Sequence, residues 1–437
     1  MSKTKSISWF YENLPEEQLI EDRFKTTIKS SYTLSGFSVI DTPAIERTET
    51  LLSKGSDDNE IYGVKRLKTD DITDFDMWLR FDLTVPLARY VAQHEWNLSF
   101  PLKTQQIGKS WRGERPQKWR YREFYQADID IIWNGSISLF ADVEVVSTIY
   151  SALNNLNFGD FLININNKKI LTGFLESLWI DKISETISII DKKDKVKTIV
   201  PLLEELPLEK NQIDSILELL KISENQKGLE VLSFFDNIQN EMLEEGIREL
   251  TYIYSHLLTM WVSDNAIQIN PAISRGLNYY TWLVFETFIV GNESVWSIAS
   301  WWRYENLCSN FSSSAFPWVW WSIGVSRLLS ILKSIWSIQT GKKTVSDILV
   351  INTGSNLLPK NLEIVKELRK QWISTELYLD ENAKFSKQIK YANNKNIPYV
   401  IIYGEEEDEK WIVQIKVLES WEQKEIKIWE LNKNLFI

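Results

Sequence analysis

The sequence is poor in the residues on which disulfides, metal sites and turns commonly depend. Its 437 residues include one cysteine, Cys308, two histidines, His94 and His256, and only 16 glycines. A single cysteine excludes an intramolecular disulfide, and one cysteine with two histidines argues against a zinc site. Neither histidine lies in a motif that would activate Cys308 as a nucleophile, so we interpret Cys308 as a small buried residue.

Long apolar runs are also missing. No run reaches the length of a membrane span, and the N-terminus lacks the apolar core of a secretion signal, so we predict a cytoplasmic protein. The formal net charge of −11 argues against non-specific nucleic-acid binding, but not against a nucleic acid held by local basic patches. The length, with 44% hydrophobic and 25% charged residues, predicts a globular protein of two or three domains.

Tryptophan is present in excess, and it stands where glycine is expected. The chain has 20 tryptophans, whereas 16 glycines fall short of the usual share of about 7%. We interpret every tryptophan except Trp111 as a UGA codon that the source organism reads as glycine. The positions in turn-like or motif-like contexts are Trp119, Trp282, Trp301, Trp302, Trp318, Trp320, Trp321, Trp411 and Trp421. Glycines at 318, 320 and 321 would form a tight turn before the strand-like SIGV. The alternative is a tryptophan-rich protein with aromatic binding platforms.

Hydrophobic periodicity predicts the organisation of the chain. Residues 1–165 have a mixed helix and strand pattern, with strand-like runs that include 79–90, and amphipathic helices follow up to about residue 262. Strand signals then resume and end with a strand that leads into a helix at 322–335. Beyond a Ser-, Gly- and Lys-rich linker, strands and helices alternate, and the acidic run 405–409 reads as a solvated turn. We therefore predict a core at 1–335 with a helical insertion at about 168–262, a linker at 336–343 and an α/β domain at 344–437.

The densest group of charged residues lies between residues 111 and 130, WRGERPQKWRYREFYQADID. Two strand-like flanks bracket a loop centred on Pro116, which predicts a hairpin with a basic tip. Because successive strand residues alternate faces, Arg122, Phe124, Gln126 and Asp130 share one face. Arginine can clamp phosphates and an aromatic ring can stack on a purine, although an exposed hairpin with solvated charges is the alternative.

This hairpin resembles motif 2 of class II aminoacyl-tRNA synthetases, specifically that of the histidyl-tRNA synthetase family, R-x-E-R-P-Q-K-G-R-Y-R-E-F, with Trp119 at the glycine. Three further segments resemble the same family in the same order. LRFDLTVPLARY (79–90) is similar to its amino-acid-binding strand, and RGLNYYTWLVFE (275–286) to its histidine-specific motif, with Asn278 in place of Asp. WWRYENL and SIGVSRLL are similar to its G-G-R-Y segment and motif 3. The resemblance covers essentially the whole chain.

The resemblance implies an α+β fold: a class II antiparallel sheet flanked by helices, a helical insertion and a C-terminal anticodon-binding α/β domain. It implies ATP-dependent ligation of L-histidine to tRNA(His) through a histidyl-adenylate, with ATP bound as its Mg²⁺ complex and no structural metal. GFSVIDTPAIE (36–46) resembles motif 1, which implies a homodimer. The alternative is a histidine-sensing regulatory paralogue without aminoacylation activity. Such paralogues generally lack the terminal domain and have damaged motif 2 arginines. This chain has the predicted terminal domain at 344–437 and retains Arg112 and Arg120 in motif 2.

The resemblance also assigns site residues. The residues it assigns to catalysis are Arg112, Arg275 and Arg327. The residues it assigns to histidine binding are Asp82, Thr84, Arg112, Gln126, Asp130, Arg275, Tyr279, Tyr280 and Tyr304. ATP binding falls to Arg112, Glu114, Arg120, Phe124 and Arg327, and the acceptor end of the tRNA to Arg115 and Gln117. The alternatives are a surface carboxylate for Asp82, core aromatics for the tyrosine pair and a solvated helix residue for Arg327. An unpaired acid in a strand between Phe81 and Leu83 would be costly, which favours the site.

Overall fold

A computed structural model of the chain describes residues 4–52, 61–66, 77–115, 117–193, 196, 198–273, 283–292, 297–304, 307–312, 314–335, 337–338 and 341–436. Within these ranges, the side chains of residues 223–225, 302, 304, 307 and 309 are not described. The chain divides into two compact units, Met1–Tyr11 with Phe24–Ile338 and Glu12–Arg23 with Gln339–Ile437.

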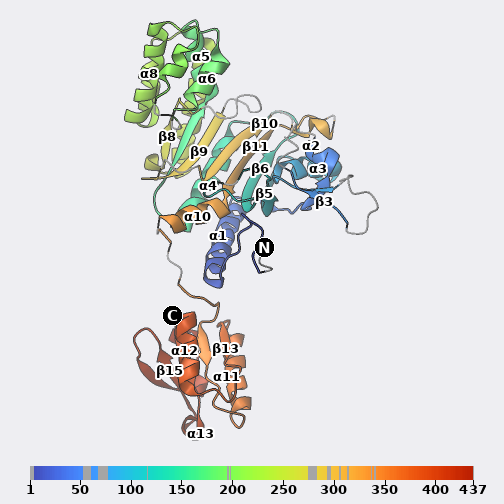
Figure 1. Cartoon of the computed structure of the whole chain (residues 1–437), viewed down its shortest axis with the longest axis vertical. Coiled ribbons are helices and arrows are strands. Elements are labelled where there is room, and N and C mark those ends of the chain that lie inside the picture. The colour runs from blue at the N-terminus through green and yellow to red at the C-terminus, as the bar shows by residue number, and fades with distance from the viewer. Residues whose placement is uncertain are drawn as a thin grey trace. The chain divides into compact units, whose positions relative to one another are not determined.

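The first unit is built on an eight-stranded sheet with the strand order β1-β5-β6-β11-β10-β9-β7-β8 (Figure 1). The six central strands pair antiparallel, while the edge strands β1 and β8 pair parallel with β5 and β7. The bounds are β1 Ser38–Val39, β5 Leu102–Trp111, β6 Glu123–Ile132, β7 Phe161–Asn167, β8 Ile267–Ile269, β9 Leu283–Ile289, β10 Ala299–Tyr304 and β11 Trp318–Gly324.

The alternation of side chains in β6 gives this sheet two different buried faces. Ile129 and Ile131 are apolar and buried. Gln126, Asp128 and Asp130 are polar, equally buried, and point to the opposite face. Because buried polar groups need partners, the polar face is the part of the sheet where a site is expected.

Helices and a small sheet complete this part of the fold. The helices are α1 Pro15–Leu34, which belongs to this unit from Phe24 onward, α2 Thr48–Leu52, α3 Thr84–His94, α4 Phe140–Leu156 and α10 Val325–Ser334, with short 3₁₀ turns at Glu95–Asn97, Asp264–Ala266 and Leu307–Asn310. The small sheet has the order β2-β4-β3, with β2 Ile45–Arg47, β3 Gly63–Val64 and β4 Met77–Leu79.

A group of helices lies between β7 and β8 in sequence, as the periodicity predicts. Its members are α5 Lys168–Ser177, α6 Ile183–Ile190, α7 Val200–Glu204, α8 Lys210–Asn225, the 3₁₀ helix η3 Gly228–Phe235 and α9 Glu241–Thr259. Asn167 and Asn240 cap α5 and α9, each accepting a backbone N–H at 3.0 Å. Gly173 allows α5 and α9 to approach closely, since a Cβ there would lie 2.6 Å from the backbone nitrogen of Leu243.

The second unit contains a five-stranded sheet with the order β13-β12-β14-β15-β16, in which β12 pairs parallel with β13 and β14. The strands are β12 Ile348–Val350, β13 Thr375–Leu377, β14 Tyr399–Ile402, β15 Ile412–Val417 and β16 Gln423–Lys427. The helices are α11 Leu358–Lys370, α12 Phe385–Lys395 and α13 Glu405–Lys410, with 3₁₀ turns at Ile428–Glu430 and Lys433–Phe436. The two units together confirm the predicted α+β class with a terminal α/β domain.

One local prediction in this unit is wrong: residues 405–409 form the first part of helix α13 and not a turn. The Glu407 carboxylate accepts the backbone N–H of Gly404 at 2.9 Å, which satisfies a free donor at the start of the helix. Acidic residues in a first turn are also favoured by the helix dipole. The charge run therefore stabilises a helix.

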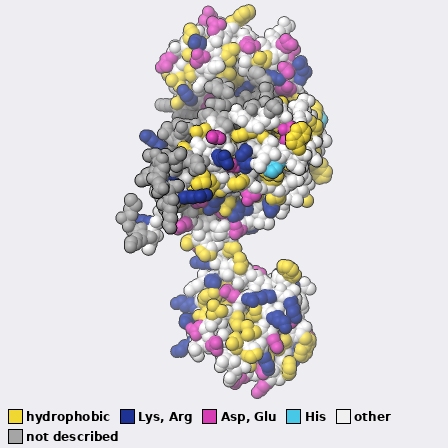
Figure 2. Space-filling model, turned by 90° about the vertical axis from the view of Figure 1, so that its right-hand side faces the viewer, with side chains coloured by type: hydrophobic (Ala, Val, Ile, Leu, Met, Phe, Trp, Pro, Cys, Tyr) yellow, Lys and Arg dark blue, Asp and Glu magenta, His cyan; other side chains and the backbone are white. Residues whose placement is uncertain are grey.

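The surface in Figure 2 carries Lys and Arg side chains in several groups on the second unit, mixed with acidic and apolar ones.

In the described part of the chain, no helix combines the length and the apolarity that crossing a membrane requires.

Tryptophan repeatedly occupies a backbone conformation that favours glycine. Among the described residues, nine that are not glycine have a positive φ, and seven of these are tryptophan, the other two being asparagine. The seven are Trp9, Trp119, Trp179, Trp261, Trp372, Trp411 and Trp421, with φ between 55 and 68°. The left-handed region costs a residue with a Cβ roughly 1–2 kcal/mol.

The tryptophans of β11 behave differently, and the tight turn expected at 318–321 is wrong. Trp318, Trp320 and Trp321 are buried in a continuous strand that pairs with β6 over all seven of its residues. The strand therefore begins at Trp318 and not at Ser322, because both neighbouring strands supply backbone partners.

Candidate active site

The tip of the β5–β6 hairpin places a basic group beside the sheet. The backbone N–H of Arg112 donates to the Arg122 carbonyl at 2.9 Å, which extends the pairing beyond the end of β5. Gln117 and Arg120 form an isolated bridge at the tip, and Trp119 between them has a φ of 66°. The turn thus requires a left-handed residue at the position where the sequence motif has glycine.

A cavity of about 160 Å³ lies against this hairpin, β11 and the start of α10. Six residues expected from the sequence line it together: Arg112, Glu114, Arg120, Phe124, Gln126 and Arg327. Trp119 and Trp320 form part of its wall. Pockets for small ligands usually measure about 300–1,000 Å³, so the indole side chains leave too little space for a nucleotide with an amino acid.

Arg112 is held at the wall of this cavity by three contacts. Its Cζ lies 5.1 Å from the centroid of the Phe124 ring, its Nε donates to the Phe81 carbonyl at 3.0 Å, and its Nη1 lies 4.0 Å from Glu114 Oε1. Glu114 also forms an ion pair with Arg120. An anion that enters the cavity therefore meets guanidinium groups and an aromatic face.

Helix α10 brings a second arginine to the cavity. Arg327 lies in the first turn of α10, and its Nη1 donates to the Ser297 carbonyl at 3.1 Å. Ser326 ties this turn to the hairpin, since its hydroxyl accepts the Tyr125 backbone N–H at 2.8 Å and lies 2.7 Å from the Tyr11 hydroxyl. The start of a helix and an arginine both favour a bound anion at this place.

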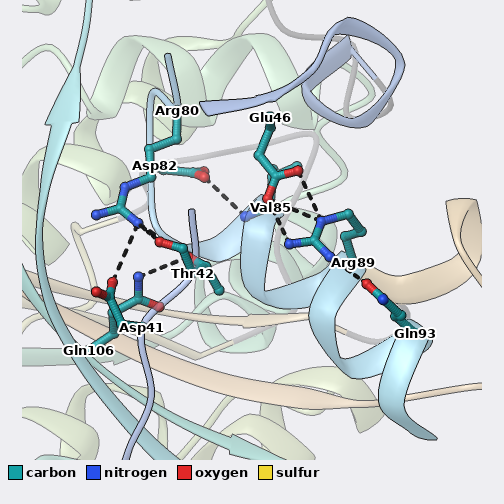
Figure 3. A network of polar contacts seen from close by, with 9 residues as sticks. All are labelled: Asp41, Thr42, Glu46, Arg80, Asp82, Val85, Arg89, Gln93 and Gln106. Atoms are coloured by element: carbon teal, nitrogen blue, oxygen red, sulfur yellow. Dashed lines mark hydrogen bonds and ion pairs between the residues drawn. The ribbon is translucent and has the colours of Figure 1, made fainter. Parts of the chain in front are cut away.

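The segment 79–90 is not a strand throughout, so that prediction is wrong. β4 ends at Leu79 and α3 begins at Thr84, where Pro86 is well tolerated because first-turn N–H groups have no partner within the helix. Asp82 lies just before this helix, and its Oδ1 accepts the Val85 backbone N–H at 3.0 Å (Figure 3). Asp82 and Thr84 are both buried, with 8% and 2% exposure, and a capping role fixes the Asp82 carboxylate.

Arg80 fixes the strand that precedes Asp82 (Figure 3). Its Nε donates to the Lys109 carbonyl at 2.9 Å, and its Nη1 donates to the Thr42 carbonyl at 2.5 Å. Nη1 also lies 3.8 Å from Asp41 Oδ1. The guanidinium passes over Gly108, where a Cβ would lie 2.5 Å from Arg80 Nη2. One buried arginine thus joins β4, β5 and the segment that resembles motif 1.

The even-numbered face of β6 carries the remaining described residues expected from the sequence. Gln126 donates to the Ser322 hydroxyl at 3.3 Å, and Asp130 Oδ1 accepts the Trp318 indole N–H at 2.6 Å. Burial, followed by the nearby charge of Asp128, raises the pKa of Asp130 well above its usual range. Phe124, Gln126 and Asp130 thus share the even-numbered positions of β6, whereas Arg122 lies before the strand begins and does not line the cavity.

Part of the expected site lies beyond the residues that the structure describes. Arg275, Tyr279, Tyr280 and Trp282 lie outside the described residues, as do the side chains of Trp302 and Tyr304. Arg115 and Gln117 are exposed at the hairpin tip. Within the described ranges, no three His, Cys, Asp or Glu side chains gather as a metal-binding group.

Two buried charged residues, Asp128 and Arg80, are not among the site residues expected from the sequence. Asp128 could have been found, because it lies two positions before Asp130 and the strand alternation puts both on one face. Arg80 gave no local signal, since its partners Thr42 and Lys109 are 38 and 29 residues away in sequence.

Comparison with known families decides the assignment. The family model described as histidyl-tRNA synthetase matches residues 10–328. The chain belongs to this family. A second model, described as an anticodon binding domain, matches residues 347–435.

Full-length relatives of the family agree with this assignment. The histidine–tRNA ligase of Clostridium tetani is 39% identical over 99% of this chain and 98% of its own length, and that of Finegoldia magna is 37% identical over 100% of both. The crystal structure of histidyl-tRNA synthetase from Nostoc sp. PCC 7120 superposes with a TM-score of 0.87 at 32% identity, covering 98% of this chain and 97% of that one.

Proposed function

We propose that this chain ligates L-histidine to tRNA(His) in two steps. The histidine carboxylate attacks the α-phosphate of ATP, so that a new oxygen–phosphorus bond forms, the bond to the β-phosphate group breaks and pyrophosphate leaves. A hydroxyl at the 3′ end of the tRNA then attacks the carbonyl carbon of the adenylate, and AMP leaves. The observation that carries the proposal is the cavity that gathers Arg112, Phe124, Gln126 and Arg327.

The side chains around the cavity match the chemistry of ATP. Arg112 and Arg327 would hold the α-phosphate and stabilise the charge that develops on it. Glu114 and Arg120 would hold the rest of the nucleotide, and the Phe124 ring would stack on adenine. Mg²⁺ enters as part of the ATP complex and supplies further charge neutralisation at the phosphates. Positioning and electrostatics would thus account for the rate enhancement.

The proposed histidine site combines Gln126, which lines the cavity, with residues of β6 and of the start of α3 that lie beyond its lining. Asp82 and Thr84 would receive the α-amino group, Gln126 the carboxylate and Asp130 the imidazole. Burial of both aspartates supports these roles, because a buried carboxylate is costly without a charged or donating partner. The family pattern adds Arg275, Tyr279, Tyr280 and Tyr304.

The tRNA would contact both parts of the chain. The exposed Arg115 and Gln117 would meet the acceptor end, and the α/β domain at 344–437 would read the anticodon. We place the boundary of the catalytic core, with its helical insertion at about 168–262, at residue 335, and the linker at 336–343. The protein acts in the cytoplasm in this proposal.

The homodimer belongs to the proposal as well. β1 lies at an edge of the large sheet with both of its residues exposed, so the segment that resembles motif 1 offers a surface for a second copy. Sedimentation at low micromolar concentration should give a dimer. A stable, active monomer would contradict this part.

Histidine-dependent exchange of pyrophosphate into ATP tests the function, with the chain that carries glycine at the tryptophan positions. We expect exchange with histidine, and charging of tRNA(His) by the same preparation. Exchange with a different amino acid, and none with histidine, would overturn the proposal. Histidine binding without exchange or charging would instead favour the histidine-sensing regulatory paralogue.

We further propose that every tryptophan except Trp111 is glycine in the native protein, with UGA read as glycine. The seven tryptophans with positive φ support this, because only a residue without a Cβ adopts that conformation freely. The small cavity beside Trp119 and Trp320 supports it too. Mass spectrometry of the native protein should find glycine there, and the gene should have UGG only at codon 111. Native peptides with tryptophan at 301 and 302, from an enzyme that charges tRNA, would contradict the proposal.

A further inference from the structure

Two buried carboxylates of β6 each bind an indole N–H from β11. Trp320 Nε1 donates to Asp128 Oδ2 at 2.9 Å, and Trp318 Nε1 donates to Asp130 Oδ1 at 2.6 Å. Both aspartates are 1% exposed, and both lie on the polar face of the sheet. The two indole N–H groups therefore occupy the hydrogen-bonding positions next to the carboxylates of Asp128 and Asp130.

Ionising two buried carboxylates on one face of a strand is unfavourable unless a positive charge or hydrogen-bond donors stabilise them. Burial, together with the charge of Asp82, raises the pKa of Asp128 to about 7, although two hydrogen bonds and the charge of Arg112 act in the opposite direction. The pKa of Asp130 is raised by burial and by Asp128. Two acids that both resist ionisation are a feature more typical of a binding site than of a structural core.

A buried acceptor without a hydrogen-bond partner on the same face indicates a ligand-binding role for this face. Gln126 lines the cavity and is 5% exposed, and its Oε1 has no hydrogen-bond partner among the described residues. The neighbouring Thr104 Oγ1 and Gln106 Oε1 on β5 also lack one in the described part of the chain. Since buried polar atoms normally form hydrogen bonds, this face is built for a ligand that supplies donors.

We propose that Asp128 is a second acceptor for the side chain of histidine, so that Asp128 and Asp130 together bind the protonated imidazolium, the form in which both ring nitrogens carry an N–H. This inference rests on the proposed function and on glycine at 318 and 320, which would remove the two indoles and open the space. The indole N–H groups of Trp320 and Trp318 mark where the substrate donors would lie.

The dimensions agree with this proposal. Residues two apart in a strand are separated by about 6.5–7 Å. A five-membered ring with a hydrogen bond of about 2.8 Å at each of its two nitrogens spans a similar distance. Asp128 would therefore exclude side chains of similar size that have only one donor, because the second buried carboxylate would remain unpaired.

The test compares Asp128→Asn and Asp130→Asn in the glycine form of the full-length chain by pyrophosphate exchange. Each should raise the KM for histidine by about tenfold or more, the loss expected for one charged hydrogen bond, with the KM for ATP unchanged. Each should also weaken the discrimination against histidine methylated at one ring nitrogen, and the two variants should respond to different methyl isomers. Asp128→Ser provides a second variant, with the same expectation, if the asparagine variant does not fold.

Asp142→Asn is the matched control. Asp142 is a fully buried carboxylate of α4 that pairs with Arg303 at 2.8 Å and does not line the cavity, so its replacement should leave the KM for histidine unchanged. An unchanged histidine KM and unchanged methyl discrimination in both Asp128 variants, with a raised KM in Asp130→Asn, would overturn the inference alone. No histidine-dependent exchange by the parent protein would instead overturn the proposed function.

Discussion

At the scale of single residues, the contact between Arg80 and Gly108 leads to a prediction about stability. A Cβ at position 108 would lie 2.5 Å from Arg80 Nη2 and 3.2 Å from Leu83 Cδ2. The guanidinium has little freedom to move, because Lys109 and Thr42 hold it. Gly108→Ala should therefore destabilise the fold by about 1–3 kcal/mol, as overpacking does. Urea unfolding measures the change.

Gly341→Ala is the matched control for this substitution. Nothing lies within 4 Å of a Cβ at Gly341, and its φ lies outside the left-handed region. The unfolding free energy should stay within about 0.5 kcal/mol of the parent, as for most surface changes. Equal losses at 108 and 341 would show that the crowding under Arg80 is not the cause.

Arg112 leads to a prediction about the chemical step. Its guanidinium is held over Phe124 and beside Glu114, so it is positioned before the substrate arrives. Arg112→Ala should raise the barrier to adenylate formation by about 3 kcal/mol, a loss of roughly 10²-fold in exchange rate. Arg122→Ala removes a neighbouring charge that does not line the cavity and should cost much less. A larger effect at 122 than at 112 would contradict the proposed roles.

At the scale of elements, the ends of the helices predict which tryptophans strain the backbone. Trp411 follows α13 with a φ of 55°, and Trp372 lies just beyond α11 with a φ of 61°. These are positions where helices usually end in glycine. Replacing either residue by glycine should stabilise the second unit by about 1–2 kcal/mol, because the strained left-handed conformation is relieved.

Trp429 is the control for the helix ends. Its exposure of 69% lies between that of Trp411 (62%) and that of Trp372 (91%), but it lies within a 3₁₀ turn and has no positive φ. Trp429→Gly should therefore give no stabilisation, since glycine only adds freedom to the unfolded chain there. Thermal melting of the three variants separates relief of strain from the mere loss of an exposed indole.

At the scale of the whole molecule, the two units predict that histidine activation and tRNA charging depend on different parts of the chain. Every described residue of the cavity lies before residue 328, whereas the anticodon-binding match begins at residue 347. Cleavage in the linker at 336–343 should spare histidine-dependent exchange and strongly reduce charging of tRNA(His). Equal loss of both reactions would mean that the terminal domain is needed for the structure of the core.

The sequence by itself determined the family and the order of most elements, because motif spacing and apolar periodicity are local properties. The hairpin of β5 and β6 and the strand that leads into helix α10 follow from it directly. It misjudged 79–90, 405–409 and 318–321, where a capping carboxylate, an acidic first turn and two neighbouring strands decide the conformation.

Only the tertiary structure decided which distant groups meet. Arg80 contacts Thr42 and Lys109, and Asp128 faces β11, through sheet pairings that join segments far apart in sequence. No local pattern contains these partners, because strand order and register arise from packing the whole core. Likewise, the sequence shows at which positions a tryptophan is unusual, but only the folded backbone shows that seven tryptophans have a left-handed φ.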